Sequence, residues 1–172
     1  ALALQAGFNV LRIGIEWSRI FPDSTFDVES PEELEELADH SAIKHYRKIL
    51  EDIKARGMKT MVNLNHFTLS LWLHDPIKVN RNLDFSKAGW LDERSPHEFA
   101  KFAAFVVKNL GEVVDFWSTM NEPNVVANLG YFQRPSGFPP SVIDPTLWKK
   151  ALDNEINAHN LAYEAMKEYT HR

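Results

Sequence analysis

An amide and a carboxyl group stand side by side where an apolar segment ends, in the stretch Ser118 to Asn124. Pro123 lacks an N–H group and disfavours helical backbone angles at Glu122, so a strand is expected to end here with Asn121 and Glu122 at its C-terminal edge. Enzymes with parallel strands keep their reactive groups at that edge. A carboxyl beside an amide can act as a general acid or base next to a group that holds a substrate hydroxyl. The alternative is a loop with both side chains in solvent.

Two other polar residues belong to predicted strands. Arg12 lies inside the strand expected for Phe8 to Ile15. It is either on an edge strand with its guanidinium in water or directed into a polar site to hold a carboxylate. His66 ends the strand expected for Lys59 to His66. A lone histidine is often structural, but its position at the end of a strand matches that of Glu122 and makes it a functional candidate.

The elements that position these residues alternate between strands and helices. Capping signals and apolar spacings of three and four residues predict helices, whereas runs of branched and aromatic residues predict strands. A polar connection is expected from Asn80 to Glu93. Besides the two strands above, we predict a strand from Val113 to Met120 and helices at Pro31–Ala38, Ser41–Arg56, Ser95–Leu110 and Pro145–Tyr169, with capping boxes at Ser30/Glu33 and Ser95/Glu98 and an N-cap at Asp144.

This alternation predicts a parallel sheet with right-handed crossovers. Three strands leave two open edges, and a complete (β/α)8 barrel takes about 250 residues. We therefore expect an α/β fold in which residues 1–172 form one partial (β/α)8 barrel domain.

Composition excludes several classes of function. The net charge of −5 comes without a basic stripe, which argues against nucleic acid and anionic membranes as partners. The absence of cysteine excludes disulfides and thiolate chemistry, and the most apolar run, Phe102 to Val107, is too short to span a bilayer. The histidines show no metal-ligand spacing, and no glycine-rich phosphate loop follows a strand. We expect a soluble, cytoplasmic protein with no metal and no cofactor.

Three ordered motifs resemble the family 1 glycoside hydrolases, which are retaining β-glycosidases on a (β/α)8 barrel. They are residues 11–22 (LRIGIEWSRIFP), residues 65–67 (NHF) continued to Trp72, and residues 119–123 (TMNEP). Residues 72–76 (WLHDP) and 136–140 (SGFPP) resemble the archaeal branch, which acts on β-glucosides and β-galactosides. The resemblance covers the chain but only about a third of the family's length, corresponding to the second to fourth βα units of the barrel.

The resemblance also implies roles for individual residues. Glu122 would be the proton donor and later the base, Asn121 would hold the sugar 2-hydroxyl, and His66 would bind another sugar hydroxyl. Arg12 would neutralise the nucleophile's carboxylate. Phe67 stands where the family usually has tryptophan in a Tyr-His-Trp motif, so a sugar-facing indole N–H is replaced by a plain ring that can still stack.

The family's nucleophile belongs to a Glu-Asn-Gly motif on the seventh strand, and this sequence has no such motif. The chain alone is therefore expected to be inactive, with a β-linked glycoside as substrate of the complete protein. The remainder of the barrel, or another copy of the chain, is the expected partner. The alternative is a noncatalytic half-barrel that self-associates and binds sugars only weakly.

Overall fold

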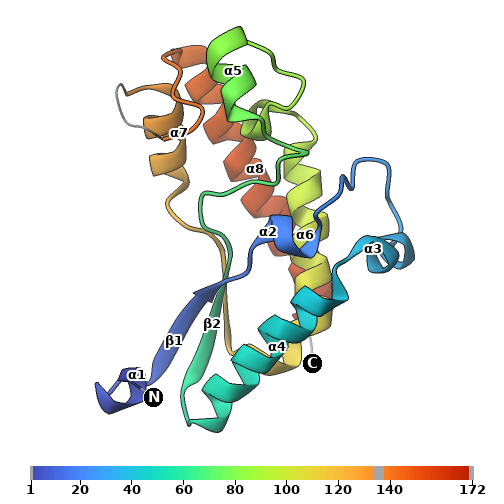
Figure 1. Cartoon of the computed structure of the whole chain (residues 1–172), viewed down its shortest axis with the longest axis vertical. Helices are drawn as coiled ribbons and strands as arrows, with labels where there is room; N and C mark the ends of the chain where they lie inside the picture. Colours follow the sequence, from blue (N-terminus) through green and yellow to red (C-terminus); the bar gives the residue numbers. More distant parts are fainter. Residues whose placement is uncertain (1, 134–137, 171–172) are drawn as a thin grey trace.

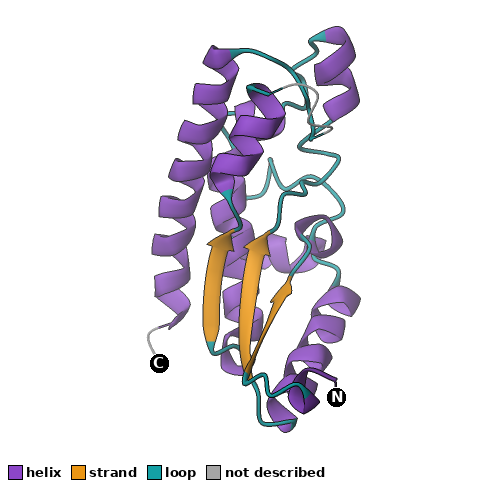
Figure 2. Ribbon diagram, turned by 90° about the vertical axis from the view of Figure 1, so that its left-hand side faces the viewer, coloured by secondary structure: helices purple, strands orange, loops and turns teal. Residues whose placement is uncertain are grey.

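The computed structural model describes residues 2–133 and 138–170. Its sheet has three parallel strands in the order β1 (Val10–Gly14), β2 (Lys59–Asn65) and β3 (Phe116–Met120). Figure 2 shows the strands pointing the same way, so that their C-terminal ends share one edge of the sheet. The predicted parallel arrangement is confirmed, and β1 and β3 are the edge strands.

Helices connect these strands and cover one face of the sheet (Figures 1 and 2). The long helices α4, α6 and α8 follow β1, β2 and β3 in turn, which gives the predicted order of strand and helix. The α-helices are α1 (Leu2–Gln5), α2 (Trp17–Ile20), α3 (Pro31–Leu37), α4 (His40–Ala55), α5 (Pro76–Asn82), α6 (Ser95–Leu110), α7 (Pro123–Tyr131) and α8 (Pro145–Thr170), and the 3₁₀ turns are η1 (Gly89–Leu91) and η2 (Gly111–Val113).

Local capping explains where several helices begin. The Ser30 hydroxyl accepts a hydrogen bond from the Glu33 N–H, and the Glu33 carboxylate accepts one from the Ser30 N–H, so the predicted capping box of α3 is confirmed. Asp39 caps α4 through the N–H groups of the first turn, a cap that was not predicted. Asp144 caps α8 in the same way, which confirms the predicted N-cap.

The core lies between the sheet and the helices, and large rings fill much of it. Trp17 stacks on Phe102 with ring centroids 5.4 Å apart and also contacts Phe99 at 5.7 Å. Phe21 meets Phe105 at 5.0 Å. Since Trp17 and Phe21 follow β1 and their partners belong to α6, these contacts fix the segment after β1 against the helical layer.

The structure corrects the prediction for the segment after β2. Asn80 to Glu93 is not a plain polar connection, because it contains the end of α5, the turn η1 and the buried ring of Trp90. The Asp75 side chain accepts a hydrogen bond from the Lys78 N–H at 3.1 Å and begins α5 with Pro76 in its first turn. This capping signal was present in the sequence and was not recognised.

The predicted capping box at the start of α6 is wrong. Ser95 is already part of the helix, and its hydroxyl donates to the carbonyl of Gly89 at 2.6 Å. Glu98 is buried and accepts a hydrogen bond from the Thr25 hydroxyl at 2.6 Å, while Lys101 pairs with it at 2.7 Å. Because both side chains bind groups outside the first turn of α6, neither of them caps the helix.

The third strand is shorter than predicted. Residues up to Val113 form the turn η2, and β3 begins only at Phe116. Asp115, just before β3, is bound by the Thr60 N–H at 2.9 Å and by the Lys59 ammonium at 3.0 Å. These bonds hold the pKa of its carboxyl well below the usual range, because they favour the ionised form.

Glu155 is a carboxyl group in the core. It lies on the face of α8 that buries Ala151 and Ala158, its exposure is 1%, and its Oε2 atom has no hydrogen-bond partner in the described residues. Burial without an opposite charge raises the pKa of Glu155 from 4.5 to about 9. The side chain is consequently a neutral acid at pH 7.

We expect Glu155→Gln to remove a pH-dependent loss of stability. The folded state holds the Glu155 proton until about pH 9, whereas the unfolded chain releases it near 4.5. The stability that this proton contributes is complete below the lower value, falls steadily as the pH rises between the two values, and is fully lost above the higher one. The loss has reached about 3 kcal/mol at pH 7. Urea unfolding of both proteins from pH 4.5 to 9 measures the difference. Parallel stability curves would show that Glu155 is ionised in the folded protein.

Candidate active site

Three polar side chains share one face of the sheet near its C-terminal edge. Successive residues of a strand point to opposite faces, and this alternation places Arg12, Asn63 and Ser118 together. The Asn63 side-chain oxygen accepts hydrogen bonds from Arg12 Nη2 at 2.8 Å and from the Ser118 hydroxyl at 3.0 Å. Asn63 is 1% exposed. It lies on the central strand β2, so its side chain links Arg12 on β1 to Ser118 on β3.

Arg12 reaches the predicted catalytic segment. Its Nη2 atom also donates to the side-chain oxygen of Asn121 at 3.0 Å. Arg12 lies on the edge strand β1 and is exposed, as in the first of the two predicted alternatives, but its guanidinium binds two side-chain amides at the edge of the sheet, as the second requires of a polar site. Within residues 2–133 and 138–170, the bonds of its guanidinium all come from Nη2 and go to neutral amide oxygens. Donors on Nη1 and Nε remain for an anion.

Asn121 is held on both its backbone and its side chain. The Asn121 N–H donates to the carbonyl of Asn65 at 2.9 Å, which extends the pairing of β2 and β3. Because its side-chain oxygen faces the Arg12 guanidinium, its amide NH₂ is directed elsewhere. Two N–H donors are therefore presented at this edge, which suits a hydroxyl oxygen as ligand.

Glu122 has an unusual backbone. Pro123 was expected to keep Glu122 extended, but its φ and ψ are 47° and 58°, the left-handed region, and α7 begins directly at Pro123. Such a conformation costs a non-glycine residue about 1–3 kcal/mol and is characteristic of functional sites. The Glu122 side chain is exposed, does not cap α7, and has no hydrogen-bond or ion-pair partner among the described residues. Its carboxyl is available to a ligand.

His66 and Phe67 form the turn that follows β2. His66 is exposed, and its ring meets that of Phe67 edge to face at 4.7 Å. Phe67 also has a left-handed backbone, with φ of 77°, and its ring contacts Phe138 at 5.2 Å. The other predicted residues thus lie at the C-terminal edge of the sheet, in the segments that follow β2 and β3. Arg12 lies within β1 and reaches this edge with its side chain.

Asn63 is the residue that sequence reasoning missed. The segment 59–66 (KTMVNLNH) places Asn63 two residues before Asn65, with apolar residues between and beside them. That period of two puts both amides on one face of a strand. Polar residues on the same face as Arg12 were the signal that could have identified it.

Two of the cavities in the structure differ in whether residues at the C-terminal edge of the sheet line them. One, of about 260 Å³, adjoins Phe67 and is lined by Leu71, His74, Trp90 and Phe138 among others. Burial lowers the pKa of His74 from 6.5 to about 4, so this wall is uncharged at neutral pH. Its lining is largely apolar and suits a hydrophobic group next to the polar edge.

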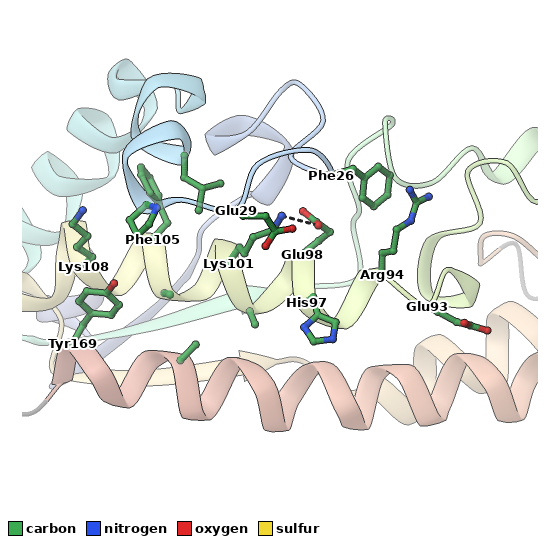
Figure 3. A pocket seen from close by; sticks show the side chains of 15 residues that line it. Phe26, Glu29, Glu93, Arg94, His97, Glu98, Lys101, Phe105, Lys108 and Tyr169 are labelled. Carbon is green, nitrogen blue, oxygen red and sulfur yellow. Dashed lines mark ion pairs between the residues drawn. The ribbon is translucent and has the colours of Figure 1, made fainter.

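The other cavity, of about 560 Å³, contains none of the predicted site residues. It lies beside α6, between the segment that leads into α3 and the end of α8 (Figure 3). Its wall carries the ion pair of Lys101 and Glu98 at 2.7 Å and the rings of Phe105 and Tyr169.

Across residues 2–133 and 138–170, no group of three or more histidine or acidic side chains could hold a metal ion. Within these ranges no helix has the length and apolar character needed to cross a bilayer. Of the motif 136–140, Ser136 and Gly137 lie outside the described residues.

The fold and the site define a segment of a parallel βα barrel with polar groups at the C-terminal edge of its strands. Residues 1–172 match glycosyl hydrolase family 1, and the chain belongs to this family. Among curated proteins it is 42% identical to a β-galactosidase of Pyrococcus woesei over 189 aligned positions, covering 98% of this chain and 37% of that protein. The predicted family is confirmed.

Solved structures agree with this assignment. Fpglu1 from Fervidobacterium pennivoraus superposes with a TM-score of 0.96 at 50% identity, covering 99% of this chain and 38% of that one. The hyperthermophilic β-glucosidase from Pyrococcus furiosus gives 0.94 at 46% identity, covering 98% and 40%. These enzymes are (β/α)8 barrels, so the predicted fold class is confirmed, and the chain spans well under half the length of these relatives.

Proposed function

We propose that the protein carrying this segment hydrolyses β-linked glycosides with retention of configuration, and that Glu122 is its proton donor and subsequent base. The observation that carries the proposal is the exposed Glu122 carboxyl, held by a left-handed backbone without a partner among the described residues, next to an amide oriented by Arg12. In retaining hydrolysis one carboxyl protonates the leaving oxygen and later activates water.

Neighbouring residues supply the sugar contacts in this proposal. Asn121 donates its amide N–H to the 2-hydroxyl, a bond that its contact with Arg12 leaves free to form. His66 binds a second hydroxyl with its exposed ring, and Phe67 offers a flat apolar surface for stacking. The relatives named β-galactosidase and β-glucosidase support glucosides and galactosides as the substrate class.

Arg12 keeps the nucleophile ionised. Retention requires a second carboxylate about 5 Å from the first, which attacks the anomeric carbon and forms a glycosyl-enzyme. We propose that the remainder of the barrel supplies this carboxylate, and that it meets the Nη1 and Nε side of Arg12, where the described residues provide no acceptor. The positive charge would stabilise the carboxylate against protonation.

Proton NMR of the first product tests the function. The full-length protein is expected to release the β-anomer from an aryl β-glucoside or β-galactoside, because two displacements at the anomeric carbon restore its configuration. The 172-residue segment alone serves as the control and is expected to be inactive, since the displacement has no nucleophile. Release of the α-anomer, or no turnover by the full-length protein, would contradict the proposal and favour the noncatalytic half-barrel.

A further inference from the structure

The turn that presents His66 is fixed by its neighbour in the sequence. Asn65 is 4% exposed, and its side-chain amide donates to the carbonyl of Thr68 at 2.9 Å. Its side-chain oxygen accepts a hydrogen bond from the Phe67 N–H at 3.3 Å. One buried amide therefore closes the turn by satisfying a donor and an acceptor that the end of β2 would otherwise leave unpaired.

The same residue connects this turn to the segment of Glu122. The backbone carbonyl of Asn65 accepts the hydrogen bond from the Asn121 N–H at 2.9 Å, and Asn65 lies opposite Met120 in the register of β2 and β3. Asn65 thus contacts the two residues that follow His66, Phe67 and Thr68, and also Asn121, the residue before Glu122. Its position couples the two loops that carry the proposed sugar contacts.

The backbone of Phe67 explains why the turn needs this support. Its φ of 77° is unfavourable for a side chain with a β-carbon, so the conformation persists only where neighbouring bonds impose it. His66 directly precedes this residue, and the direction of its ring depends on the same turn. Relaxation of Phe67 toward an ordinary backbone would move His66 away from the edge.

A second bond holds the far end of the turn. The Thr68 hydroxyl donates to the Glu16 carboxylate, whose two oxygens both lie 2.8 Å away. Glu16 follows β1, and its own N–H donates to the Tyr46 hydroxyl at 3.1 Å, which anchors it to α4. The turn is therefore braced from β1 as well as from β2.

We propose that Asn65 is a positioning residue, braced through Thr68 by Glu16, that imposes the left-handed backbone of Phe67 and thereby aims His66 at a sugar hydroxyl. The proposal rests on the function above, because His66 is useful in this position only if it binds substrate. Because the brace acts through the direction of one ring, it would determine how well the site distinguishes substrates that differ in the hydroxyl facing His66.

The test compares variants of the full-length protein on a parent aryl glycoside and on analogues that each lack one hydroxyl. His66→Ala is measured first, to identify the hydroxyl that His66 binds. This is the hydroxyl whose removal from the substrate makes His66→Ala as active as the unsubstituted protein. Asn65→Asp keeps the shape and the acceptor for Phe67 but loses the donor to Thr68. It is expected to lower kcat/KM on the parent about 10- to 100-fold, because displacement of a binding group by about 1 Å has that effect. On the analogue lacking that hydroxyl it should have little effect.

Thr68→Val provides an independent variant, because it removes only the hydroxyl bound to Glu16 at an exposed position. It should show the same selectivity between substrates, and Thr68→Ser should restore the parent activity. Asn109→Asp is the matched control, since its amide likewise donates to a backbone carbonyl, that of Phe105 at 3.0 Å, within α6.

The outcomes separate this inference from the function on which it rests. Equal losses on all analogues, wild-type behaviour of both brace variants, or the absence of any hydroxyl that makes His66→Ala harmless would each overturn the positioning role. None of these results affects the retaining hydrolysis measured with the wild-type protein. Failure of the wild-type protein to hydrolyse any β-glycoside would instead refute the proposed function.

Discussion

Glu122→Gln in the full-length protein is expected to slow the hydrolysis of glycosides with poor leaving groups by about 10²- to 10⁴-fold, because glutamine cannot protonate the departing oxygen. Aryl glycosides with activated leaving groups should still form the glycosyl-enzyme, since their bond breaks without that proton. Its breakdown should then become limiting, so pre-steady-state measurements are expected to show a burst of aglycone. The alkaline limb of the pH–rate profile should disappear with the proton donor.

A matched substitution checks that the effect is local. Glu164→Gln changes another exposed glutamate, on α8 and outside the proposed site, and is expected to leave the profile unchanged. If Glu122→Gln reduced activity equally on activated and unactivated substrates, Glu122 would have some role other than proton transfer. The contrast between leaving groups is therefore the decisive quantity, and it is independent of how much folded enzyme each preparation contains.

Arg12→Met should raise the pKa of the nucleophile and move the acidic limb of the pH–rate profile upward. A positive charge within about 4–6 Å lowers a carboxyl pKa by about 1–3 units, so its removal should shift the limb by a similar amount. Turnover at low pH should fall most, because the carboxyl must be ionised to attack. The measurement is kcat/KM against pH, which reports the ionisation of the free enzyme.

Arg12→Lys separates charge from geometry. Lysine retains the positive charge but cannot reproduce the two bonds that Arg12 donates to Asn63 and Asn121 at 2.8 and 3.0 Å. The acidic limb of this variant is expected to stay near its original position while kcat/KM falls across the whole pH range. If Arg12→Met left the limb unchanged in a folded protein, Arg12 would be a structural residue that only orients the two amides.

Local signals in the sequence determined the order of the elements and predicted where the candidate site lies. Apolar periodicity and capping residues predicted the parallel arrangement, and Pro123 marked the end of β3 at Asn121 and Glu122. These predictions depend on residues only a few positions apart, which act in the same way in any fold. The same signals failed at Ser95 and Glu98, because Ser95 binds the carbonyl of Gly89 in the preceding turn and Glu98 binds Thr25, 73 positions before it, in place of the expected capping box.

Only the tertiary structure decided how the site is joined together. Arg12 binds amides that lie 51 and 109 positions away in the sequence, and Thr68 binds a carboxylate 52 positions before it. Such contacts depend on strand register, because a shift of one residue would turn every side chain of a strand to the opposite face. The left-handed backbones of Glu122 and Phe67 are likewise imposed by surroundings that assemble only on folding, since neither residue prefers that conformation in isolation.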